Sequence, residues 1–113
     1  MKRDLKIYLA DILESSDLIA DYLKKVDYQK FSKDVGVQDK VLRRLSIIGE
    51  ITRSLPKGFK EKHSKIPWGR IAGMRNVIIH EYCGVEMQRI WKAAKHDLLK
   101  LQKEIKKIFA EIK

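Results

Sequence analysis

The C-terminal part of the chain carries the most restrictive pattern in the sequence. Apolar residues recur there at alternating steps of three and four, at Trp91, Ala94, Leu98, Leu101, Ile105, Ile108 and Ile112. Such a heptad-like seam is typical of a long helix that buries one stripe against other helices. A helix from Glu86 to Lys113 would be about 40 Å long at about 1.5 Å per residue, so its stripe needs partners of comparable length.

Two earlier segments can supply those partners. From Asp4 to Val26, and again from Val37 to Leu55, apolar residues are spaced by three, four or seven, as on the buried face of a helix. The periodicity lapses between residues 27 and 34. We therefore expect two long amphipathic helices in the first half of the chain.

A shorter third helix is expected between these and the C-terminal helix. Pro56-Lys57-Gly58 ends the second helix, and LPKGFKEKHSKIP follows as a polar loop. Pro67 suits the first turn of a helix, and Gly84 can take the left-handed conformation common after a helix end. The sequence predicts an all-α fold: an antiparallel four-helix bundle with a short third helix, in a single domain over residues 1–113.

Charge and composition narrow the partners and the compartment. Lys and Arg number 25 against 15 Asp and Glu, and the formal net charge of +10 favours a polyanionic partner without specifying one. Acidic residues interrupt the N-terminal apolar residues, which argues against a signal peptide. No apolar stretch is long enough to span a membrane, so we expect a cytoplasmic chain with no membrane contact. Cys83 is the only cysteine, and neither a metal site nor a cofactor is expected.

The charged residues of the C-terminal helix are expected to form mainly a solvated face. Lysines alternate there with acidic residues, at Lys92, Lys95, Asp97, Lys100, Lys103, Glu104, Lys106, Lys107 and Glu111. Steering of a nucleic acid by some of these lysines is a minor alternative.

One segment, WGRIAGMRNVIIHEYCGV, places polar groups where a helical bundle has no need of them. Arg75, Asn76, His80 and Tyr82 combine a planar cation suited to phosphate, a group that exchanges protons near neutral pH and a hydroxyl donor. Together they suit phosphodiester cleavage. Arg75 and His80 would differ by about 140° on an ideal helix, so a site that uses all four residues needs a distorted helix end or two protomers, and we favour the homodimer.

These residues resemble the signature of the HEPN superfamily, and within it of the HepT-like toxins. The family motif is R-x4-6-H, often extended as R-x4-H-x-Y, and RNVIIHEY matches it with a polar residue, Asn76, directly after the arginine. The I-x-G-E stretch from Ile47 to Glu50 is similar to the same subgroup. The resemblance spans essentially the whole chain.

The resemblance implies a metal-independent endoribonuclease that acts as the toxin of a prokaryotic toxin–antitoxin pair, with a homodimer whose two motifs face a shared basic cleft. Arg75 would stabilise charge on the scissile phosphate, His80 would act in general acid–base catalysis of attack by the ribose 2′-hydroxyl, and Asn76 would orient the site. The implied antitoxin is a minimal, MntA-like nucleotidyltransferase that places AMP on Tyr82. Glu50 would support Arg75.

Less specific interpretations stay open beside these. His80 can be a hydrogen-bonded structural histidine, Arg75 a structural partner of Glu50, and Tyr82 a packed aromatic at a helix end. For the whole chain, the alternatives are a non-catalytic HEPN subunit that presents nucleotide or substrate to a nucleotidyltransferase, and a basic helical nucleic-acid-binding module. Binding by such a module would weaken with salt and survive His80→Ala.

Overall fold

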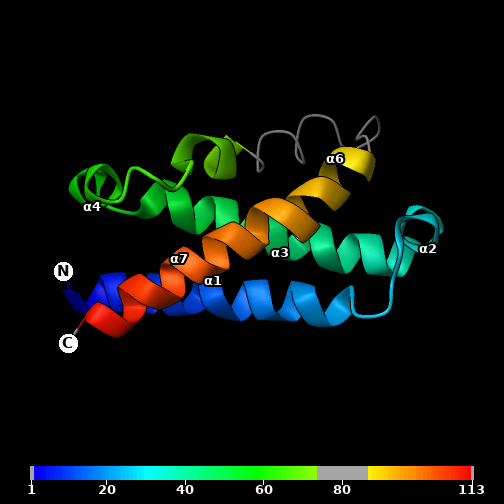
Figure 1. Ribbon diagram of the computed structural model, residues 1–113, viewed down its shortest axis with the longest axis horizontal. Coiled ribbons are helices and arrows are strands. Elements are labelled where there is room, and N and C mark those ends of the chain that lie inside the picture. The colour runs from blue at the N-terminus through cyan, green and yellow to red at the C-terminus, as the bar shows by residue number, and fades with distance from the viewer. Residues whose placement is uncertain (1, 74–86, 113) are drawn as a thin grey trace.

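The computed structural model describes residues 2–73 and 87–112, and every regular element among them is helical (Figure 1). The predicted all-α class is therefore confirmed for this part of the chain. The elements are α1 (Lys2–Tyr22), α2 (Tyr28–Lys33), α3 (Val35–Ser54), α4 (Lys57–Lys62), a short helix over residues 68–73, α6 (Met87–Lys92), the π-helical turn η2 (Ala93–Asp97) and α7 (Leu98–Glu111). The rest of the expected third helix falls on residues 74–86, outside the described residues.

Helices α1, α3 and α7 enclose the core. Helix α1 packs against both α3 and α7, and each of these runs antiparallel to it (Figure 1). The helices form because their apolar residues share one face, and burying each large side chain contributes about 1.5–3 kcal/mol. The side chains sealed between them include Leu9, Ile12, Ile19, Leu23, Val41, Leu45, Ile48, Leu101 and Ile105.

The segment in which the periodicity lapses folds into the six-residue helix α2, which is too short to display a helical pattern in the sequence. Asp27 caps it, because its side chain accepts a hydrogen bond from the backbone N–H of Lys30 at 2.8 Å. Asp34 ends α2 and begins α3, whose Val37 N–H donates to the Asp34 carboxylate at 3.1 Å. Phe31 is fully buried, so α2 is held by the core.

The interpretation of residues 55–67 as a loop is wrong over α4, which occupies Lys57–Lys62. Pro56 precedes it as the N-cap residue, a position where a missing N–H costs nothing. The indole Nε1–H of buried Trp68 donates to the backbone carbonyls of Lys60 and His63 at 3.1 and 3.0 Å. This tertiary contact holds the end of α4, which explains why local sequence did not predict the helix.

The C-terminal helix follows the expected seam from Ala94, inside a π turn, onward. Ala94, Leu98, Leu101, Ile105 and Ile108 are buried as predicted, and Ile112 is half-buried. In the π turn, the N–H of Leu98 donates to the carbonyl of Ala93, the five-residue spacing of a π-helix. On the N-terminal side of this turn the buried residue is Ile90, whereas Trp91 is half-buried and packs its ring 5.3 Å from that of Phe31.

Candidate functional site

Four of the predicted site residues, Arg75, Asn76, His80 and Tyr82, lie outside the described residues. Glu50, the fifth, is exposed in the last turns of α3, where its carbonyl accepts a hydrogen bond from the Ser54 hydroxyl at 3.3 Å. The described part of the site is therefore the residues on either side of the motif segment, residues 74–86.

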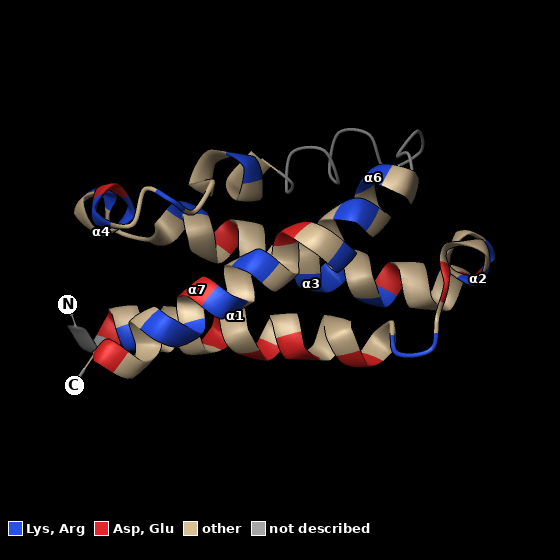
Figure 2. Ribbon diagram, viewed as in Figure 1, with Lys and Arg blue, Asp and Glu red and all other residues tan. Residues whose placement is uncertain are grey.

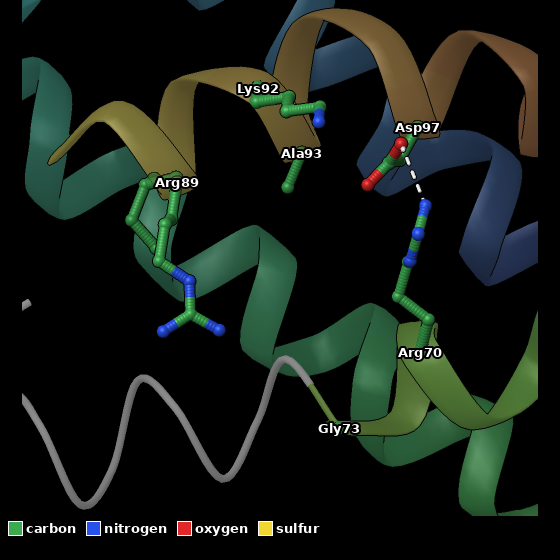
Figure 3. Close-up of a pocket in the computed structure, with 7 residues that line it drawn as sticks. Arg70, Gly73, Arg89, Lys92, Ala93 and Asp97 are labelled. Atoms are coloured by element: carbon green, nitrogen blue, oxygen red, sulfur yellow. Dashed lines mark ion pairs between the residues drawn. The ribbon is translucent and has the colours of Figure 1, made fainter. Parts of the chain in front are cut away.

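A pocket of about 430 Å³ lies between described residues that flank the motif segment in the sequence (Figure 3). One wall is formed by the helical residues 68–73, among them Arg70 and Gly73. The other wall is α6 and η2, which begin directly after the segment. The described residues that line the pocket are Arg70, Gly73, Arg89, Ile90, Lys92, Ala93 and Asp97.

The π turn decides which charges face this pocket. Lys92 and Asp97 are five residues apart, and an α-helix would separate them by about 140°. Bonding from residue i to i+5 winds the chain less per residue and brings such a pair toward the same side. Single π turns inside helices recur at functional sites. Here the turn places both side chains at the pocket.

An ion pair bridges the two walls. A guanidinium nitrogen of Arg70 lies 3.6 Å from a carboxylate oxygen of Asp97 (Figure 3), and the Asp97 side chain is only 19% exposed. Arg70 reaches it from the helix over residues 68–73, so the pair ties that helix to η2. Because Arg70 is itself 66% exposed, solvent screens this ion pair and it adds little stability.

The pocket carries an excess of positive charge. Among the described residues that line it, three side chains are cationic, Arg70, Arg89 and Lys92, and one is a carboxylate, Asp97. Ile90 and Ala93 are buried and give it an apolar floor. Figure 2 shows the same bias at larger scale, with Lys and Arg on α6 and along α7 and with acidic residues repeated along α1. Such an arrangement favours an anion, and arginine forks suit phosphate best.

A second hollow of about 410 Å³ lies at the opposite end, near the two termini. Its lining includes Phe59, Lys62, His63 and Glu111, and the rings of Phe59 and His63 are 4.8 Å apart. The described residues that line this second hollow do not adjoin the motif segment in the sequence. Across residues 2–73 and 87–112, no three His, Cys, Asp or Glu residues form a group that could hold a metal ion.

A family model described as "Ribonuclease HepT-like" matches residues 12–108, which is most of the chain. The chain belongs to the HepT-like family. The resemblance drawn from RNVIIHEY and from the I-x-G-E stretch is therefore confirmed at the level of the family.

Relatives of this HepT-like chain come from archaea and bacteria. It is 39% identical over 108 residues to "Probable ribonuclease HepT" of Thermococcus cleftensis, which covers 96% of the chain and 98% of that relative. It is 41% identical over 106 residues to a candidate RNase of Caldanaerobacter subterraneus subsp. tengcongensis, covering 94% of the chain and 95% of the relative. No solved structure gives a significant match.

One relative is longer and contains a similar sequence over about half of its length. The HepT-like chain is 44% identical over 112 residues to a Methanocaldococcus jannaschii protein named as a gamma-glutamylcyclotransferase and candidate RNase. The match covers 99% of the chain and 50% of that protein, so the chain spans about half of this relative's length. Within the described residues, no helix is both long and apolar enough to cross a membrane.

The sequence did not identify the pocket of this HepT-like chain. Lys92 and Asp97 were assigned to a solvated face, which is wrong for Asp97, because its largely covered carboxylate pairs with Arg70. Arg70 and Arg89 carried no pattern that set them apart from the other 23 Lys and Arg residues, out of 25 in all. The only available signal was that these basic residues lie just before and just after the motif segment.

Proposed function

We propose that this chain is a metal-independent endoribonuclease, the toxin of a prokaryotic toxin–antitoxin pair. The observation that carries the proposal is membership of the HepT-like family by a chain that holds Arg75, His80 and Tyr82 in the spacing R-x4-H-x-Y. The excess of positive charge among the described residues that line the pocket supports it, since an RNA backbone is a polyanion.

The chemistry follows from the three residue types. His80 takes the proton of a ribose 2′-hydroxyl as that oxygen forms a bond to the neighbouring phosphorus, and an imidazolium returns a proton to the departing 5′-oxygen as its bond to phosphorus breaks. The products are a 2′,3′-cyclic phosphate and a 5′-hydroxyl. Arg75 stabilises the negative charge that develops on the phosphoryl oxygens, and Asn76 orients the group. No redox partner or added water is needed in this step.

We propose a homodimer as the active form, with residues 1–113 as one HepT-like domain in the cytoplasm. His80 is five positions after Arg75, a spacing that points them about 140° apart on a regular helix. Two protomers related by a twofold axis can bring an arginine of one to the histidine of the other. Glu50, on α3, would hold Arg75 in place.

Regulation would act through Tyr82. A minimal, MntA-like nucleotidyltransferase antitoxin would transfer AMP from ATP to its hydroxyl, with loss of the hydroxyl proton and release of pyrophosphate, which adds a bulky phosphodiester anion two residues from His80. Such a group blocks the cleft and repels RNA. Intact mass of the chain made with and without a minimal nucleotidyltransferase of this kind would test this step, and an unchanged mass, or AMP on another residue, would contradict it.

The decisive test of the proposed activity is cleavage of a labelled RNA in EDTA by the wild-type chain and by His80→Ala. We expect cleavage by the wild type with 2′,3′-cyclic phosphate ends, and a loss of at least about 100-fold for the variant, because general acid–base catalysis contributes about that much or more. His96→Ala is the matched control, since this exposed histidine should leave the rate unchanged. Binding without cleavage by the wild type would favour the non-catalytic HEPN subunit.

A further inference from the structure

We propose that the pocket between the helix over residues 68–73 and the α6–η2 segment is a phosphate subsite for the RNA backbone, separate from the scissile phosphate. Arg89 and Lys92 supply the contacts, Arg70 faces them from the other wall, and Asp97 limits the affinity by offsetting one of the three cations. This inference rests on the ribonuclease function proposed above.

The three cations line the pocket from two separate elements (Figure 3). Arg89 and Lys92 are three residues apart on α6 and so share one face of that helix. Arg70 comes from a different element and extends across the pocket toward Asp97 (Figure 3). At about 430 Å³ the pocket lies within the size range of small-ligand sites. A phosphate with part of its ribose is the anion of this size that recurs along an RNA chain.

The ion pair leaves Arg70 able to bind an anion. At 3.6 Å, the contact with Asp97 is an electrostatic pair that exceeds normal hydrogen-bond length. A guanidinium carries five N–H donors in a planar fork, which can still meet two phosphate oxygens. The Asp97 carboxylate lies beside the same guanidinium, and its negative charge opposes the binding of a phosphate there.

The position of the pocket in the sequence favours the RNA substrate itself as its ligand. Its wall ends at Gly73, two residues before Arg75, and resumes with α6 seven residues after His80. Because these walls adjoin the motif segment in the sequence, the RNA strand that the motif cleaves is the polyanion we expect to reach this pocket. Contacts to phosphates position a strand and carry no base specificity, so the subsite should act on RNA of any sequence.

The test compares a short and a long substrate. In EDTA, kcat and KM are measured for a dinucleotide with one phosphodiester and for a ten-nucleotide RNA, using the wild type, Arg89→Gln/Lys92→Gln and the control Lys103→Gln/Lys106→Gln. The control removes the same charge from exposed positions on α7. We expect the pocket variant to raise KM for the longer RNA roughly tenfold or more while the dinucleotide is unaffected. Circular dichroism establishes that all variants fold.

Asp97→Asn supplies a prediction of opposite sign. It keeps the shape of the side chain but removes the opposing charge, so RNA should bind more tightly by a few-fold at low salt. RNA binding without cleavage is measured in a His80→Ala background. There the slope of the logarithm of the binding constant against the logarithm of the salt concentration should become shallower by about 0.7 when the pocket variant loses one phosphate contact. A purely structural role for these residues would instead weaken binding in all the pocket variants.

The possible failures are distinguishable. Equal changes in the pocket variant and in the α7 control would overturn the subsite, since the effect would then be one of general charge. Loss of dinucleotide cleavage in the pocket variant would also overturn it, because the pocket would then belong to the scissile phosphate. If the wild type cleaves neither substrate, the proposed ribonuclease function fails. In that case the subsite is tested by RNA binding alone, and equal RNA affinities of the pocket variant and the α7 control would overturn it.

Discussion

Replacing Trp68 with Phe should reveal how one tertiary hydrogen-bond donor holds the wall of the pocket. Trp68 is 8% exposed and opens the short helix that carries Arg70 and Gly73. Its indole N–H is shared between the carbonyls of Lys60 and His63, at the end of α4. Phenylalanine keeps an aromatic ring in the site but has no donor, so both carbonyls lose this contact.

The expected cost has two parts. Losing the shared hydrogen bond in a largely buried place costs about 1–3 kcal/mol, since the carbonyls lose a partner that water replaces poorly. The smaller ring gives up roughly 40 Å² of apolar contact, or about 1 kcal/mol. The free energy of unfolding should therefore fall by about 2–4 kcal/mol, which is a large share of the stability of a small domain.

Urea denaturation followed by circular dichroism measures this loss, with Trp91→Phe as the matched control. Trp91 is half-buried, its ring lies 5.9 Å from that of Tyr28, and among the described residues its Nε1 has no hydrogen-bond partner. The control should lose only the contact area, about 1 kcal/mol. If the two substitutions cost the same, the hydrogen bonds of Trp68 do not hold α4 and the reasoning is refuted.

Two further substitutions probe the helix junction and the core by the same urea denaturation. Asp34→Ala should cost about 1 kcal/mol, because the N–H of Val37 loses its cap; Asp39→Ala on the exposed face of α3 is the control, and an equal effect would argue against capping. Ser16→Ala should be neutral or stabilising by up to about 1 kcal/mol, since the Ser16 hydroxyl is buried and has no partner within the described structure. A marked destabilisation would indicate a partner for it.

The long helices could be predicted from the sequence because their pattern is local. Ile12 and Ile19 on α1, and Leu101 and Ile105 on α7, recur at helical spacing and are all buried. A face of this kind needs some apolar partner, whichever helix supplies it. The six-residue helices α2 and α4 could not be predicted in this way, because one and a half turns give too few repeats.

The π turn shows a different limit. The sequence places Trp91 on the apolar seam, but Ile90 takes the buried position once the turn changes the phase of the helix. The aromatic rings of Tyr28 and Phe31 then pack against Trp91 from α2. The choice between Ile90 and Trp91 was made by packing between elements distant in the sequence, which no local period contains.

The helical class, the long amphipathic segments and the HepT-like family follow from the order of residues, because helical periodicity and the RNVIIHEY motif are properties of that order. The contact between Arg70 and Asp97, across a pocket that Arg89 and Lys92 also line, is a property of the folded chain. It depends on the phase of one π turn and on the hydrogen bonds by which Trp68 joins the helix over residues 68–73 to the end of α4. Arg70 and Asp97 are far apart in the sequence, so only packing between helices brings them together.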